Sequence, residues 1–191
     1  MGSFQKDDII FRYREVGEGT PFILQHGIGG DLNQSLGFYK PPPGIRLISF
    51  DFRAHGETKP IGDISKLNFY AFADDVIALM DHLKIEKAVL GGVALGAGVA
   101  INAALQYPFR ILALVLIQPA WLAGPMTDEA ISFYSKVVHY LQQYGPLEGR
   151  KRFMVSEEYA ELEEISPHTA KYLANQFTRS HSLELIARLK R

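Results

Sequence analysis

The chain has no cysteine among its 191 residues, and this absence excludes several kinds of site. Without thiols there can be no disulfide framework, no cysteine-ligated metal and no cysteine nucleophile. An excess of charge of one sign is also missing, because 20 basic residues stand against 21 acidic ones and the formal net charge is −1. A dedicated nucleic-acid surface needs a basic excess, so we expect no nucleic-acid partner.

Long hydrophobic runs are absent as well. No apolar stretch approaches the roughly 20 residues that span a bilayer, and residues 1–6 contain no apolar signal-peptide region. We therefore expect no membrane partner and a cytoplasmic location. No helix carries a His-Glu-x-x-His pair, and no P-loop or dinucleotide fingerprint occurs. The sequence thus predicts neither a metal site nor a cofactor.

The most informative stretch that is present covers residues 87–100. It begins as a short apolar run of β-forming residues, passes through the turn Gly-Val-Ala-Leu-Gly at 92–96, and continues as a small-residue helix that ends before Pro108. A strand that enters a helix through a G-x-x-x-G turn is the pattern of a nucleophile elbow, whose central residue is ordinarily serine. Here the central residue is Ala94, so the turn is present and the hydroxyl is not.

Strand signals alternate with helix signals along the first two thirds of the chain. Residues 8–16 alternate as an antiparallel edge strand does. The apolar runs at 22–25, 45–50 and 111–117 are typical of buried parallel strands. Asn68 is placed to N-cap a helix with one apolar face. This order predicts an α/β fold with a mostly parallel, doubly wound sheet.

After residue 123 only helix signals remain. Thr127 is placed as an N-cap, and Gly145-Pro146 is a stop signal for the helix that it begins. A second helical segment is expected over about 147–164, and Ser166 with Pro167 opens a third. We therefore predict two domains, a core at 1–123 and an α-helical cap or lid at 124–191.

Three loops carry a resemblance to a known family. Residues 26–30, 51–56 and 92–96 each follow a predicted strand, in the same order as in the α/β-hydrolases. Over its whole length the chain resembles an α/β-hydrolase with a helical cap. The resemblance implies an oxyanion hole formed by the backbone amides of Ile28 and Leu95. It also implies a triad in the order serine, acid, histidine, with the acid and histidine on strands after the cap that this chain lacks.

The early histidines have simpler interpretations than catalysis. We expect His26 to brace its loop and His55 to belong to a structural turn, in which Asp51 fixes the loop and Ala54 replaces the usual glycine. The histidines of the cap, at positions 139, 168 and 181, are expected on the surface, and the alternative for His139 is a place in the pocket beneath the cap. The residues that we expect to line a substrate pocket are His26, Gly27, Trp121, Phe133, Tyr134 and Val137.

Two functional hypotheses follow from the resemblance. In the first, the intact, serine-bearing protein hydrolyses a small apolar ester, lactone or other acyl compound, and the chain as written is inactive because of Ala94. In the second, the chain is a non-catalytic protein that binds a ligand or a partner. The alanine is either an engineered replacement or a natural one, whereas a haloalkane dehalogenase would need aspartate there. We also expect self-association through the incomplete sheet.

Overall fold

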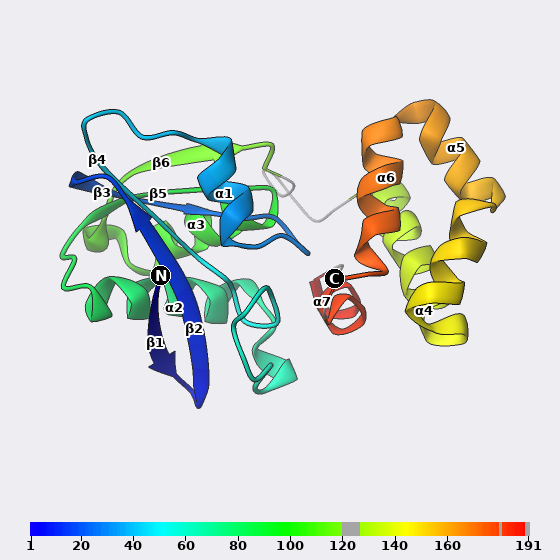
Figure 1. Ribbon diagram of the computed structural model, residues 1–191, viewed down its shortest axis with the longest axis horizontal. Helices are drawn as coiled ribbons and strands as arrows, with labels where there is room; N and C mark the ends of the chain where they lie inside the picture. The colour runs from blue at the N-terminus through cyan, green and yellow to red at the C-terminus, as the bar shows by residue number, and fades with distance from the viewer. Residues whose placement is uncertain (120–126, 180, 190–191) are drawn as a thin grey trace. The chain divides into compact units, whose positions relative to one another are not determined.

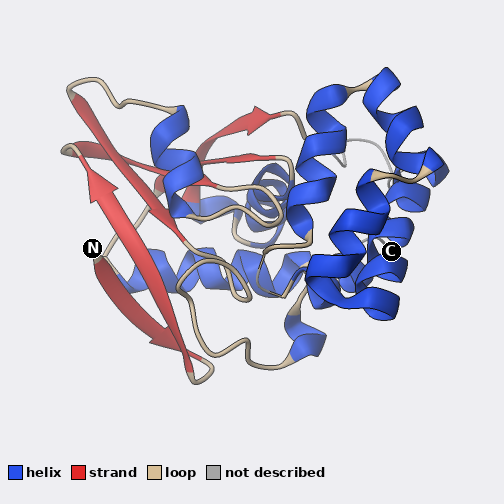
Figure 2. Ribbon diagram, turned by 45° about the vertical axis from the view of Figure 1, so that its right-hand side comes forward, coloured by secondary structure: helices blue, strands red, loops and turns tan. Residues whose placement is uncertain are grey.

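The computed structural model describes residues 1–119, 127–179 and 181–189. The chain divides into two compact units, Met1–Gly124 and Pro125–Arg191. All strands that the structure describes belong to the first unit (Figure 2). Its elements are β1 (Gly2–Lys6), β2 (Ile9–Val16), β3 (Gly19–Gln25), α1 (Leu32–Phe38), β4 (Gly44–Phe50), η1 (Ile64–Lys66), α2 (Phe69–His82), β5 (Ala88–Val93), α3 (Leu95–Gln106), η2 (Pro108–Arg110) and β6 (Ile111–Ile117).

The strands form one six-stranded sheet in the order β1-β2-β4-β3-β5-β6. Strands β4, β3, β5 and β6 pair in parallel, while β2 pairs antiparallel with both β1 and β4. Helix α1 lies on one face of the sheet, and α2 and α3 lie on the other (Figure 1). The mostly parallel, doubly wound α/β fold predicted from the sequence is therefore confirmed.

The prediction of an edge strand at residues 8–16 is wrong. Strand β2 lies inside the sheet, because β1 pairs with it on the outer side. The buried ring of Phe4 in β1 stacks on Phe11 in β2 with a centroid distance of 4.7 Å. An alternating pattern reports that one face of a strand is buried and does not report whether a neighbour pairs with it. The pattern of β2 therefore could not reveal β1.

Burial explains the central strands and the first long helix. The second halves of β3 and β4 are buried, with Ile23 and Ile48 fully inaccessible. Helix α2 starts where Asn68 was expected to cap it, because the Asn68 side chain accepts a hydrogen bond of 2.9 Å from the amide of Ala71. Its buried face includes Phe72 and Val76. The helix thus covers the sheet with the apolar side that the sequence indicates.

The second unit is entirely helical within its described residues. It contains α4 (Asp128–Met154), α5 (Glu157–Ile165), α6 (Pro167–Gln176) and α7 (Ser182–Leu189). Its core includes Phe153, whose ring packs 5.4 Å from that of Phe177 and 5.5 Å from that of Tyr159. None of the described helices of the chain is long and apolar enough to cross a membrane.

The helix boundaries of this unit agree with the sequence in part. Thr127 and Ser166 are N-caps as expected. Gly145 has φ 71° and ψ −178° and interrupts α4, so the expected stop is a kink after which the helix resumes at Pro146. The prediction of a single helix over 147–164 is wrong. Helix α4 ends at Met154, and α5 begins at Glu157 with the Ser156 side chain as its N-cap.

Candidate active site

The sharp turn between β5 and α3 is built around Ala94. This residue has φ 48° and ψ −102°, a conformation that L-amino acids rarely adopt. Its amide donates a hydrogen bond of 3.0 Å to the carbonyl of Ile117, and its carbonyl accepts one of 3.2 Å from the amide of Gly98. Helix α3 begins at Leu95, directly after this residue. The strand therefore turns into the helix at a single strained residue.

Two glycines make this turn sterically feasible. A Cβ atom placed on Gly92 would lie 2.1 Å from the carbonyl carbon of Gly96. One placed on Gly96 would lie 2.6 Å from the carbonyl oxygen of Gln25 and 2.8 Å from that of His26. Both contacts are with backbone atoms, which cannot move aside as a flexible side chain can. The first turn of α3 is thus pressed against the backbone that leaves β3.

The loop after β3 lies beside the elbow, as the resemblance implies. A Cβ atom on Gly27 would be 3.9 Å from the Cβ of Ala94. The amide of Gly27 donates to the Oε1 of Gln34 over 2.8 Å, and the amide of Gly30 donates to the carbonyl of Gly27 over 3.0 Å. Gln34 belongs to α1, a helix that no pattern in the sequence predicts, so the contact is not foreseeable from the sequence. The oxyanion-hole role of Ile28 and Leu95 stays a prediction.

His26 braces this loop. Its side chain is fully buried, and its Nε2 accepts a hydrogen bond of 3.2 Å from the amide of Phe52. The proton therefore sits on Nδ1, which donates to the carbonyl of Gly27 over 2.8 Å. Burial lowers the pKa of His26 to about 4, so the ring is neutral at pH 7. Both ring nitrogens are engaged with the backbone, which leaves neither for a substrate proton.

The loop after β4 is held by a buried carboxylate. Asp51 accepts hydrogen bonds from the amides of Leu32 at 2.7 Å and Glu57 at 2.8 Å. Burial raises the pKa of Asp51. The two hydrogen bonds lower this pKa, but the effect of burial is larger. In the same loop, Ala54 adopts φ 63°, and the buried His55 places its Nδ1 3.0 Å from the carbonyl of Arg53. The prediction that Asp51 fixes the loop is confirmed.

The predicted pocket residues of the cap are only partly described. Trp121 lies outside the described residues. Phe133 and Tyr134 are half-buried on α4, and Val137 on the same helix is buried. Burial raises the pKa of Tyr134. These residues belong to the second unit, so their place in a substrate pocket stays a prediction. The three cap histidines, at positions 139, 168 and 181, are exposed, as expected.

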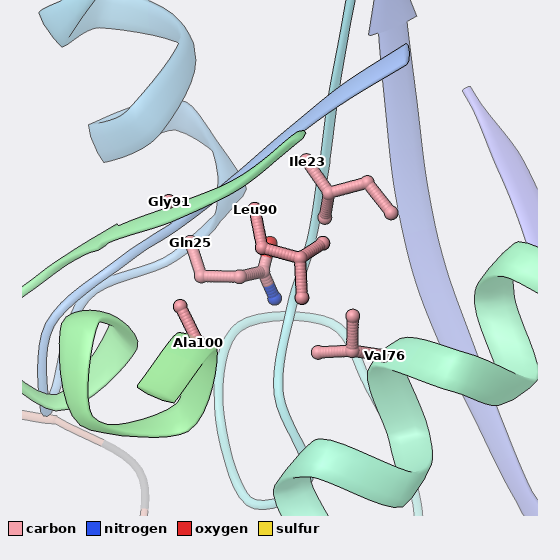
Figure 3. Close-up of a pocket in the computed structure, with 6 residues that line it drawn as sticks. All are labelled: Ile23, Gln25, Val76, Leu90, Gly91 and Ala100. Atoms are coloured by element: carbon pink, nitrogen blue, oxygen red, sulfur yellow. The ribbon is translucent and has the colours of Figure 1, made fainter. Parts of the chain in front are cut away.

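A small cavity lies in the core of the first unit, between the sheet and its helices (Figure 3). It is lined by Ile23, Gln25, Val76, Leu90, Gly91 and Ala100 and leaves no room for a water molecule. The Nε2 of Gln25 is buried beside it without a hydrogen-bond partner. This cavity is a packing defect and not a binding site. Across the described residues, no group of three or more His, Asp or Glu side chains is placed to hold a metal ion.

Comparison with known proteins agrees with this geometry. The profile of the alpha/beta hydrolase fold family matches residues 20–148, and the chain therefore belongs to this family. Over 127 residues it is 40% identical to the dihydrolipoyllysine-residue acetyltransferase component of the acetoin cleaving system of Pseudomonas putida, a match of 63% of this chain and 33% of the relative. Over 139 residues it is 30% identical to the 2-hydroxy-6-oxo-6-phenylhexa-2,4-dienoate hydrolase of Comamonas testosteroni, a match of 68% of this chain and 48% of the relative.

Solved structures share the fold over nearly the whole chain. The enol-lactonase from Burkholderia xenovorans LB400 superposes with a TM-score of 0.69 at 18% identity, over 99% of this chain and 72% of the enzyme. A hydrolase from Pseudomonas aeruginosa PA01 gives a TM-score of 0.68 at 23% identity, over 99% of this chain and 71% of that protein. The matches to the two curated relatives above cover 33% and 48% of their lengths.

Proposed function

We propose that this chain is part of a capped hydrolase of the serine type in which Ala94 occupies the nucleophile position. The observation that carries the proposal is the strained elbow, where Ala94 adopts a positive φ between β5 and α3. Such strain persists only where the surrounding structure enforces it, and it is concentrated at functional sites. The backbone of Gly27 next to the elbow supports the same interpretation, because two loops have to meet there to form an oxyanion hole.

In the serine-bearing form, the elbow hydroxyl would attack the carbonyl carbon of the substrate. A histidine would take the hydroxyl proton and pass it to the leaving group, while an acid orients that histidine. The amides of Ile28 and Leu95 would donate to the oxygen that becomes negatively charged. The positive end of the α3 dipole lies at the same point and favours that charge. No step of this scheme requires a metal or a cofactor.

We propose a small apolar ester, lactone or other acyl compound as the substrate of the serine-bearing form. The name of one relative supports a small carbonyl substrate. A 2-hydroxymuconate semialdehyde hydrolase of Pseudomonas is 27% identical to this chain over 154 residues, a match of 54% of its length. The aromatic side chains of Phe133 and Tyr134 on α4 support an apolar one. A cap function for residues 124–191 and a cytoplasmic location stay predictions of the sequence.

The alternative function is binding without catalysis. Ala94 itself favours it, because an alanine side chain has no atom that can act as nucleophile. In this case the chain would hold a small acyl ligand or a partner next to the elbow and release it unchanged. The two functions predict different results for a serine at position 94: hydrolysis is restored in the first and not in the second.

The deciding experiment crosses the residue at position 94 with chain length. This chain and a version extended to the length of its solved relatives would each carry Ala94, Ala94→Ser or, as a control without a hydroxyl, Ala94→Gly. We expect no hydrolysis of an aryl ester above the protein-free rate in any short version, because an isolated serine is a weak nucleophile without a base. Only the extended Ala94→Ser protein should turn over ester and react with a serine-directed phosphonate.

Two outcomes contradict parts of this proposal. If the short Ala94→Ser chain matches the extended one, a histidine of this chain is the base, and the placement of the triad after the cap is wrong. If the extended Ala94→Ser protein is inactive on every ester and lactone tested although it folds, the binding function is the better one.

A further inference from the structure

Gly27 differs from nearly all other glycines of the chain, because its backbone conformation and its neighbours do not require a glycine. The other glycines that the structure describes have a positive φ or would place a Cβ atom within 3.0 Å of a neighbour, with Gly37 as the one exception. Gly37 is exposed on α1, whereas Gly27 is buried. A Cβ atom on Gly27 would meet its nearest neighbour, the carbonyl oxygen of Val93, at 3.5 Å, which is an ordinary contact. Folding therefore does not explain the missing side chain of Gly27.

Hydrogen bonds hold the backbone of Gly27 at both of its ends. Its amide donates to the Oε1 of Gln34 over 2.8 Å. Its carbonyl accepts from the Nδ1 of His26 over 2.8 Å and from the amide of Gly30 over 3.0 Å. A Cβ atom on Gly30 would lie 2.5 Å from the Oε1 of Gln34, so the glycine at position 30 makes room for the bond to Gly27. Because both ends of Gly27 are held, the direction in which a side chain would leave its Cα is fixed as well.

That direction leads towards the elbow. The position of the added Cβ atom is 3.9 Å from the Cβ of Ala94, 3.8 Å from the Oε1 of Gln34 and 3.5 Å from the carbonyl oxygen of Val93. A methyl group at this position would therefore displace none of these three atoms. With glycine at position 27, this space between Gly27 and Ala94 is left open, and a ligand can approach the backbone there more closely than any other residue would permit.

We infer that the space beside Gly27 receives a methyl branch on the α-carbon of the acyl group, so that the site prefers α-branched acyl groups to acetyl. The inference rests on the proposed function in one respect, that the elbow is a ligand site, and it holds for hydrolysis and for binding alike. A serine at position 94 would attack the carbonyl carbon of the ligand, so this carbon has to lie next to the elbow. Its α-carbon is one bond away and adjoins the same space. Gly27 thus determines specificity for the acyl group.

Titration of this chain with sodium acetate and, separately, with sodium isobutyrate tests the inference by nuclear magnetic resonance at constant ionic strength. Each carboxylate resembles the acid that hydrolysis would release, and its binding needs no nucleophile. Isobutyrate should bind about tenfold more tightly than acetate, because two additional carbon atoms leave water. Gly27→Ala fills the space with its own methyl group. It should weaken isobutyrate binding by about tenfold and acetate binding much less, since only the branched acid competes for that space.

Gly37→Ala is the matched control. A Cβ atom on Gly37 would have no neighbour within 4 Å, so this change adds the same methyl group to the same unit in open space. It should leave the binding of both acids unchanged. In the extended Ala94→Ser protein, Gly27→Ala should also lower kcat/KM for p-nitrophenyl isobutyrate relative to p-nitrophenyl acetate by about tenfold. A general loss of stability would lower both values and leave their ratio unchanged.

The inference is overturned if isobutyrate does not saturate this chain, if it binds no more tightly than acetate, or if Gly27→Ala binds it as the unchanged chain does. Should Gly27→Ala fail to fold, the preference of the unchanged chain between the two acids decides. An extended Ala94→Ser protein that is inactive on both esters contradicts hydrolysis, while selective isobutyrate binding that Gly27→Ala removes still supports the inference. Hydrolysis with an ester ratio that Gly27→Ala does not alter supports the proposed function and overturns the role of Gly27.

Discussion

The neutral, buried ring of His26 links the candidate site to stability. Burial lowers its pKa to about 4 from the ordinary value of 6.5. In the unfolded chain the ring takes up a proton as the pH falls below 6.5, whereas in the folded chain it stays neutral until about pH 4. The unfolded state therefore binds more protons in this window, and the free energy of unfolding decreases as the pH falls through it.

We expect the titration of His26 to lower the free energy of unfolding by about 2 kcal/mol as the pH falls from 8 to 5. Guanidinium denaturation at both pH values measures the effect. A His26→Asn variant lacks the titrating ring and should lose that much less stability over the same interval, while the exposed His139→Asn is the matched control. Equal pH dependence in the chain and in both variants would contradict the assignment of a neutral His26.

At the scale of elements, strand β6 is the one with an unusual environment. It pairs with β5 on one side and ends the sheet on the other. Leu112 is 53% exposed, Leu114 38% and Val115 41%, and the strand carries no charged residue. Natural sheets protect such edges with charges, prolines or covering segments. The parallel run expected to be buried on both faces is therefore largely exposed.

We propose that a second copy of the chain covers this edge by pairing its own β6. An uncharged strand can pair antiparallel with itself about a two-fold axis without repulsion between like charges. Sedimentation should show dimers or larger species that increase with concentration, and Leu114→Lys should shift the chain towards monomer. Leu147→Lys, at an exposed leucine of α4, is the control. A monomer at every concentration would refute this pairing.

The sequence predicted the elements whose signals are local. The structure confirms three predicted helix N-caps and the G-x-x-x-G turn, because each of these features depends on a few neighbouring residues. The three N-caps are Asn68, Thr127 and Ser166. Strand β1 and helix α1 were missed. Both are short, and tertiary contacts stabilise them, such as the Phe4–Phe11 stack and the bond from Gly27 to Gln34. Such contacts leave no periodic pattern in the sequence.

The candidate site was predictable to a similar extent. The position of Ala94 and the meeting of its turn with Gly27 follow from motif order. The tautomer of His26 does not, since it depends on the amide of Phe52, a residue far along the chain. The buried bond from Arg53 to Asp75 likewise joins residues that lie 22 positions apart in the sequence. Long-range hydrogen bonding is thus what the sequence alone could not supply.

For the whole molecule, the division into two units predicts how stability is distributed. The strand-containing unit and the helical unit each have a buried apolar core. Phe153 is fully buried and contacts Tyr159 and Phe177 within the helical unit. A change at this residue should therefore act on the unit that contains it.

We expect Phe153→Ala to destabilise the helical unit by about 3–5 kcal/mol through loss of buried area and the resulting cavity. Hydrogen exchange measured by mass spectrometry should show faster exchange in peptides from 127–179. Peptides from β3, β4 and β5 should keep their rates. Equal acceleration in both sets of peptides would mean that the two units unfold as one, against this prediction.

The strained elbow and the absence of cysteine together have a practical consequence. A cysteine introduced by Ala94→Cys would be the only thiol in the chain, located at the first turn of α3, where the helix dipole lowers a thiol pKa and increases its reactivity. A single fluorophore, spin label or cross-linker could then be attached at one defined position, the turn between β5 and α3. The turn that would hold a nucleophile in the serine-bearing form could thus serve, in this chain, as a site for labelling at a single thiol.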